Sequence, residues 1–287
     1  MIEQTQPPSR LWRILQFPLV RIVLAFTWLI AVVATTELAI QLLPARETAP
    51  VTVLSAGLVV LTACLSYSAF VRIVEKRPAT ELAASGAVAE LASGILLGAM
   101  LFTATIGILW SLGYYKVTGM NNWLAAAPVF AGAVISGVVE EILFRGILFR
   151  IAEQVLGTWL ALLISALLFG LLHLFNPNAT WVAAIAIALE AGILLAAAYV
   201  LTRRLWFAIG VHFAWNFTQG GIFGVAVSGN QAAGLLQATL TGPELLSGGE
   251  FGAEASIFAV AVCLTAGAYL LWRAQNKGNF VRPLWGR

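Results

Sequence analysis

Residues 131–149 read AGAVISGVVEEILFRGILF, an apolar helical stretch that two adjacent glutamates and an arginine interrupt. An ionised carboxylate in the low-dielectric interior of a membrane is costly, so membrane helices rarely carry one without a function. Glu140 and Glu141 are followed by the only two histidines of the chain, His173 and His212, in later apolar segments. Carboxylates and imidazoles serve in general acid–base catalysis and in metal binding. We therefore expect a buried reactive site within a bundle of membrane helices.

The composition is that of a polytopic membrane protein. Of the 287 residues, 60% are hydrophobic and 10% are charged, whereas a soluble domain has about a quarter of its residues charged. Apolar runs approach or exceed the roughly 20 residues that cross a bilayer as a helix. They cover about 22–43, 51–71, 91–115, 123–143, 156–175, 181–201, 205–227 and 255–272. The sequence therefore predicts an all-α bundle of about eight transmembrane helices.

The position of the polar residues divides this bundle into three parts. Residues 1–122 would hold helices one to three, and residues 123–227 would form the core with the site in helices four to seven. Residues 228–287 would supply an outside loop, the last helix and a basic tail.

The distribution of basic residues predicts the orientation in the membrane. Lys and Arg flank alternate gaps between the apolar runs, and only Arg46 and Lys116 fall on the other side. The connection 228–254 has three glutamates and no Lys or Arg. The positive-inside rule then places both termini in the cytoplasm. The net charge of +3 follows from this asymmetry and is not evidence for a nucleic-acid partner; the expected partners are membrane lipids and a membrane-associated substrate.

The first polar motif contains Glu140, Glu141 and Arg145. Consecutive helical residues point about 100° apart, so the two glutamates cannot share one direction. Glu141 precedes Arg145 by four residues, the favoured arrangement for an ion pair within a helix. We expect Glu141 to pair with Arg145 and Glu140 to face a cavity. An ion-pair pocket that only braces the bundle would also account for these charges.

The second motif places Phe169 and His173 on one helix face, with Gly170 allowing a neighbouring helix to approach closely. A histidine near the end of a span can also be a simple interfacial side chain. If the chain turns back near Gly157, however, Glu140 lies 17 residues before the turn and His173 lies 16 after it. In an antiparallel hairpin the two side chains would reach the same depth.

The third motif places His212 and Asn216 four residues apart, with two hydrogen-bonding groups on one face of an apolar helix. Such groups face the interior of a membrane bundle, where they lock helices together or line a wet cavity. Since Arg145 and Arg204 flank the basic side close to Glu140 and His212, the site is expected to open toward that side.

Together the three motifs resemble those of the type II CAAX-prenyl-protease family and its bacterial relatives, the Abi or CPBP family of intramembrane proteases. That family carries Glu-Glu-x-x-x-Arg, Phe-x-x-x-His and His-x-x-x-Asn on consecutive core helices. The chain matches all three in order, and the resemblance covers about residues 123–220. It implies a peptidase in which Glu140 and His173 activate a water molecule. His212 and Asn216 would stabilise the oxyanion of the tetrahedral intermediate.

The resemblance further implies that Glu141 and Arg145 support the shape of the site. No cofactor is expected, because the chain lacks His-Glu-x-x-His; the alternative is a zinc metalloprotease with Glu140, His173 and His212 as ligands. The expected substrate is a membrane-anchored or membrane-inserted peptide, with or without a lipid. Glu190, a further intramembrane acid, lies outside the three motifs.

Two readings from other functional classes use the same residues. A transporter could employ buried Glu and His side chains as a proton relay, although the sequence has no inverted repeat. A non-catalytic membrane scaffold could retain the motifs without turnover.

Overall fold

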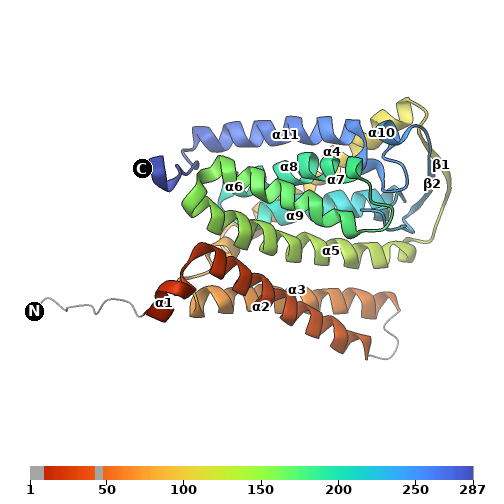
Figure 1. Ribbon diagram of the computed structural model, residues 1–287. Coiled ribbons are helices and arrows are strands. Elements are labelled where there is room, and N and C mark those ends of the chain that lie inside the picture. The colour runs from red at the N-terminus through yellow and green to blue at the C-terminus, as the bar shows by residue number, and fades with distance from the viewer. Residues whose placement is uncertain (1–9, 43–47, 287) are drawn as a thin grey trace, which may run out of the picture.

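The computed structural model describes residues 10–42 and 48–286, and within them it is a helical bundle with one small antiparallel sheet (Figure 1). The predicted all-α fold class is confirmed.

The N-terminal part contains α1 (Arg10–Leu15), α2 (Pro18–Gln41), α3 (Ala49–Ile73), η1 (Thr80–Leu82) and α4 (Ala87–Ser111). The central part contains η2 (Trp123–Ala126), α5 (Ala127–Glu141), η3 (Ile142–Phe149), α6 (Arg150–Leu172), η4 (His173–Phe175), α7 (Trp181–Ile187), η5 (Ala188–Gly192), α8 (Ile193–Thr202), α9 (Leu205–Asn216) and η6 (Phe217–Ile222). The C-terminal part contains α10 (Glu244–Ser247), η7 (Ala253–Ala255), α11 (Ile257–Asn276) and η8 (Leu284–Gly286).

The sheet pairs β1 (Tyr115–Met120) with β2 (Leu236–Leu240) at one end of the bundle. Tyr115 lies opposite Leu240, and Met120 lies opposite Leu236. Figure 1 shows both strands at the end of the molecule opposite α1 and η8.

Six helical segments within the described residues are long and apolar enough to cross a membrane. One of them, Trp123–Phe175, spans 53 residues and turns back at Gly157, whose φ of 76° departs from the helical region. The turn predicted near Gly157 is therefore present. The predicted number of eight spans is not confirmed, because α9 has only 12 residues and continues into the polar segment η6.

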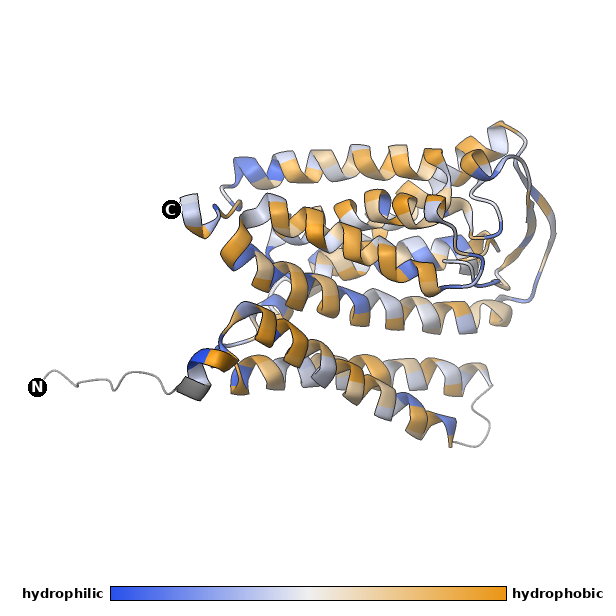
Figure 2. Ribbon diagram, in the orientation of Figure 1, coloured by the Kyte–Doolittle hydropathy of each residue, from blue (hydrophilic) through white to orange (hydrophobic). Residues whose placement is uncertain are grey.

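The outer surface of the helices is apolar. Leu54 on α3 is 74% exposed, and Leu38 on α2 and Trp110 on α4 are also largely exposed. Figure 2 shows apolar residues along most of the length of α2 and α3. An apolar surface of this extent is suited to lipid rather than to water, so the protein is an integral, multi-pass membrane protein.

Helices α4 and α9 lie in backbone contact through small residues. A Cβ atom added to Gly94 or Gly98 of α4 would overlap the carbonyl oxygen of Phe207 or Val211, and one added to Gly210 of α9 would overlap that of Leu91. Small residues permit this approach in membrane helices, where close packing holds the helices together. The position of α9 is thus fixed by α4.

The opposite end of the bundle carries ion pairs that cross between elements. The guanidinium of Arg150 lies 2.7 Å from Glu75, and that of Arg203 lies 2.6 Å from Glu153. Figure 1 shows α1, the first described helix, on this side. Two of the basic residues used to predict the orientation, Arg46 and Arg287, lie outside the described residues.

Candidate functional site

The first motif lies where α5 passes into the π-helical segment η3. Glu141 is the last residue of α5, and Arg145 lies inside η3. Both side chains are completely buried, and Arg145 Nη1 donates to Glu141 Oε1 at 2.8 Å. Arg145 also donates to the carbonyl oxygens of Ala191 and Gly192. The predicted pairing of Glu141 with Arg145 is confirmed, and it connects the first motif to η5.

Glu140 has a different environment from its neighbour. Its side chain is 32% exposed, and its Oε2 atom has no hydrogen-bond partner. The ring of His212 lies close by, with its Nε2 3.9 Å from that oxygen. Glu140 therefore has one buried, unpartnered oxygen near His212, while the partly exposed side chain lines a cavity.

His212 is buried on α9 and is oriented by the first motif. Its Nδ1 lies 2.9 Å from Glu141 Oε1, so the imidazole donates through Nδ1 to an ionised carboxylate. The other nitrogen, Nε2, points toward Glu140. One glutamate thus holds the ring while the adjacent one faces its free edge.

His173 begins η4, directly after the end of α6. Its Nδ1 lies 2.7 Å from the carbonyl oxygen of Phe169, and since a carbonyl can only accept, Nδ1 carries the proton. In the neutral ring Nε2 then presents a lone pair. The Phe169 ring packs against His173 and also under the Arg145 guanidinium, with 4.8 Å between centres in both cases.

Asn216 ends α9, one turn beyond His212. Its Nδ2 donates to the hydroxyl of Ser136 on α5 at 3.1 Å. Because a primary amide has two N–H groups, one donor remains available to another partner. Ser136 lies four residues before Glu140 on the same helix, so this hydrogen bond joins the first and third motifs.

A cavity of about 440 Å³ brings the motifs together. It is lined by the four residues that the sequence singled out for the chemistry, namely Glu140, His173, His212 and Asn216. Glu140 and His173 therefore reach the same cavity from the two arms of the hairpin, as the spacing about Gly157 predicts.

The cavity lies toward the end of the bundle that carries the sheet. Its other walls include Pro128 at the start of α5, Asn176 after η4, and residues 227–228 and 230–232. The expectation that the site opens toward the basic side is wrong. It took Arg145 as a residue flanking the membrane, whereas this side chain is fully buried inside the core.

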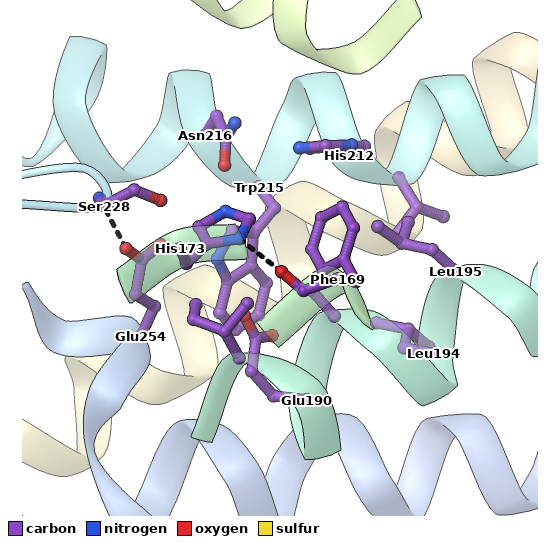
Figure 3. A pocket seen from close by; sticks show the side chains of 13 residues that line it. Phe169, His173, Glu190, Leu194, Leu195, His212, Trp215, Asn216, Ser228 and Glu254 are labelled. Atoms are coloured by element: carbon purple, nitrogen blue, oxygen red, sulfur yellow. Dashed lines mark hydrogen bonds between the residues drawn. The ribbon is translucent and has the colours of Figure 1, made fainter. Parts of the chain in front are cut away.

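A smaller chamber of about 20 Å³ lies behind the imidazoles, which is room for about one water molecule. Figure 3 shows His173, His212 and Asn216 around it, together with Ser228, Glu190 and Glu254. Glu190 is 2% exposed and Glu254 is 1% exposed. Glu190 thus lies behind the principal cavity and does not line it.

Several lining residues were not identified from the sequence. The position of Ser136, one helical turn before Glu140, was a signal that could have revealed it. Asn176, Ser228 and Glu254 lie in connections or short turns, where no periodic pattern relates a side chain to the site. Burial raises the pKa of Glu254 to about 7.

Glu140, His173 and His212, the ligands of the zinc alternative, line one cavity. Among the described residues, no group of three or more His, Cys, Asp or Glu side chains is arranged to hold a metal ion. His212 is bonded to Glu141 through Nδ1 and keeps Nε2 free, an arrangement that metal-binding histidines also adopt. The metal-free mechanism therefore stays a prediction.

Residues 121–218 match a protein family described as type II CAAX prenyl endopeptidase Rce1-like. The matched segment contains all three motifs and most of the cavity walls. No curated protein and no solved structure matches the chain. Residues 121–218, which carry the Glu140, His173 and His212 motifs around one cavity, are thus similar to the Rce1-like family of type II CAAX prenyl endopeptidases.

Proposed function

We propose that the protein is an intramembrane endopeptidase that hydrolyses a peptide bond in a membrane-anchored or membrane-inserted peptide. The observation that carries this proposal is the convergence of Glu140, His173, His212 and Asn216 on one cavity of about 440 Å³. A cavity of this size can hold several peptide atoms together with a water molecule. The polar groups come from α5, η4 and α9 and meet in an otherwise apolar bundle.

Glu140 and His173 are proposed to activate the attacking water. Glu140 lines the cavity with a side chain that is 32% exposed, and His173 offers the Nε2 lone pair that its bond to Phe169 leaves free. A water held by both groups can lose one proton to Glu140 while its oxygen attacks the scissile carbonyl carbon. Glu140 then returns that proton to the amide nitrogen as the carbon–nitrogen bond breaks.

His212 and Asn216 are proposed to stabilise the oxyanion that forms during the attack. Asn216 has a second amide N–H beyond the one that Ser136 receives. His212 can donate through Nε2 when both ring nitrogens are protonated, a form that the nearby carboxylates of Glu140 and Glu141 stabilise. Donors fixed in advance in a site of low dielectric are effective because they need no reorganisation during the reaction.

Glu141 and Arg145 are proposed to support the site without touching the substrate. Their ion pair is completely buried, and Arg145 is anchored to the backbone of η5. Removing either partner would leave an uncompensated buried charge.

The substrate is proposed to be a peptide or protein held at the membrane, with or without a lipid anchor, and the contacts with lipids follow from the exposed apolar helices. We propose that both termini are cytoplasmic, on the basis of the positive-inside rule. With that orientation the cavity faces the opposite side of the membrane.

The proposal is tested with purified protein in liposomes and a fluorogenic membrane-anchored peptide library. Wild-type protein is expected to cleave at least one peptide, and Glu140→Gln is expected to lose turnover because the amide cannot take a proton from water. Glu37→Gln is the matched control, since Glu37 lines a separate groove between α2, α3 and α5. Equal cleavage by Glu140→Gln and wild type would disprove the mechanism.

A further inference from the structure

A tight turn, Val227–Asn230, forms one wall of the cavity. The backbone groups of Val227 and Asn230 exchange two hydrogen bonds of 2.9 Å each. Both central residues have positive φ, 47° at Ser228 and 81° at Gly229. Glycine adopts this conformation freely, but for serine it is unfavourable. Ser228 therefore needs external contacts to keep its position beside the site.

Those contacts come from the segment that leads into the last span. Glu254 on η7 accepts the backbone N–H of Ser228 through Oε1 (Figure 3). The carbonyl of Phe251 accepts the N–H of Gly229 at 2.8 Å. On the other side, Asn178 Nδ2 donates to the carbonyl of Gly229 at 3.1 Å. The turn is held between the end of the hairpin and the start of α11.

The acceptor of the Ser228 N–H is a buried carboxylate, that of Glu254. It is 1% exposed, and burying a carboxylate is costly unless hydrogen bonds compensate for the lost water. Burial raises its pKa to about 7. The ionisable groups that face it are Glu190 on η5, Cys263 on α11 and His212 on α9, with His173 lining the same chamber. A neutral acceptor would hold the turn without this cost.

We infer that Glu254 is a positioning residue whose carboxylate fixes the Val227–Asn230 turn as a rigid wall of the cavity, against which the peptide substrate aligns. This role rests on the proposed peptidase function. Ser228 lines both the principal cavity and the smaller chamber, so a shift of the turn would change the space beside His173 and Asn216. We call the hydrogen bond from the Ser228 backbone to Glu254 the clamp. Loss of the clamp should therefore weaken productive binding of the peptide more than it slows the chemical step.

Amide hydrogen exchange of the segment 225–232 tests the clamp directly. Glu254→Ala should accelerate exchange there by about tenfold or more, because it removes the acceptor of the Ser228 backbone N–H and of the Ser228 and Gln219 side chains. Glu254→Asp, which keeps the charge but is one methylene shorter, should do the same to a smaller extent. Glu254→Gln keeps an acceptor oxygen and should retain most of the protection. Glu250→Gln, an exposed acid of the same connection, is the matched control and should leave exchange unchanged.

Peptidase kinetics of the same variants test the positioning role. Glu254→Ala and Glu254→Asp should raise KM about tenfold with kcat within about threefold of wild type, and Glu254→Gln should restore KM. Unchanged exchange in both Glu254→Ala and Glu254→Asp overturns the clamp. A fall in kcat alone overturns the positioning role. If wild-type protein cleaves no peptide, the proposed function fails, while the exchange data still decide the clamp.

Discussion

Glu141 Oε1 lies 2.9 Å from His212 Nδ1, so the residue next to the proposed base orients the proposed oxyanion donor. The same oxygen accepts from Arg145 at 2.8 Å. Glu140 and Glu141 point in different directions from consecutive positions of α5, and the imidazole of α9 lies close to both. Glu140 thereby supplies the proposed base, and the adjacent Glu141 sets the tautomer of His212.

Glu141→Gln should therefore lower kcat with little change in KM. The amide can still occupy the space, but it no longer supplies the negative charge that holds His212 and balances Arg145. We expect a loss of roughly 10–100-fold, the range seen for partners that orient metal-bound imidazoles. Single-turnover and steady-state rates measure it, with Glu37→Gln as the control. A variant with wild-type kcat would show that Glu141 has no part in orienting the ring.

His212→Ala and Asn216→Ala should each lower kcat by roughly 10²–10³, the usual cost of removing one oxyanion donor. Ser136→Ala should lower it by less than about tenfold, because this hydroxyl only orients the Asn216 amide. The rates of the three variants, measured with one peptide, rank the groups. If Ser136→Ala costs as much as Asn216→Ala, the serine touches the substrate itself.

Catalysis should not require a metal ion. The mechanism assigns hydrogen-bonding roles to His212 and Asn216, and the amide of Asn216 is a good donor but a poor zinc ligand. Incubation with a strong chelator should leave the peptidase activity unchanged. Metal analysis of the purified protein should find no stoichiometric zinc. Loss of activity to the chelator and its recovery with added zinc would establish the metalloprotease alternative.

The principal cavity should be reached from the side of the membrane opposite the termini. A cysteine at Gln231, in the wall of the cavity, should react with an impermeant thiol reagent added outside intact cells, after Cys64 and Cys263 are replaced by serine. A cysteine at exposed Asn276, at the end of α11, should react only after the cells are opened. The reverse pattern would invert the proposed topology.

The stability of the protein should depend on the ionisation of Glu254. Its pKa is raised from 4.5 to about 7 by burial, so between these values the folded state binds more protons than the unfolded state. Stability from this group is present below about pH 4.5 and is lost as the pH rises to about 7. Glu254→Gln should therefore gain Tm relative to wild type over this window, and Glu250→Gln should not. A difference in Tm that is constant or falls with pH would contradict this assignment.

Helix periodicity and spacing predicted much of the core because these features are local. The Glu141–Arg145 pair follows from helical geometry, and the turn at Gly157 needs a residue that tolerates positive φ. The close approach at Gly170 is also present, since a Cβ atom there would overlap the carbonyl oxygen of Ala184. Each of these features is encoded within a few residues.

Features that depend on contacts between distant segments could not be predicted. The π-helical segments η3, η5 and η6 follow the polar motifs or contain a buried acid, and π-helical turns are frequent at functional sites. Nothing in the periodicity distinguishes them from α-helix. The Ser228–Glu254 contact joins residues 26 apart within an irregular connection. The number of eight spans is not confirmed because α9, although apolar, has only 12 residues.

The glycine contacts between α4 and α9 have a consequence for how the sequence can vary. No described residue of α4 lines either cavity, yet Gly94 and Gly98 leave no room for a larger side chain against the helix that carries His212 and Asn216. In a library of single substitutions, both helices should therefore tolerate few changes. α9 is constrained by the chemistry of His212 and Asn216, and α4 is constrained by the lack of space at Gly94 and Gly98. Intolerance to mutation in α4 therefore reflects its packing against α9 and not membership of the active site.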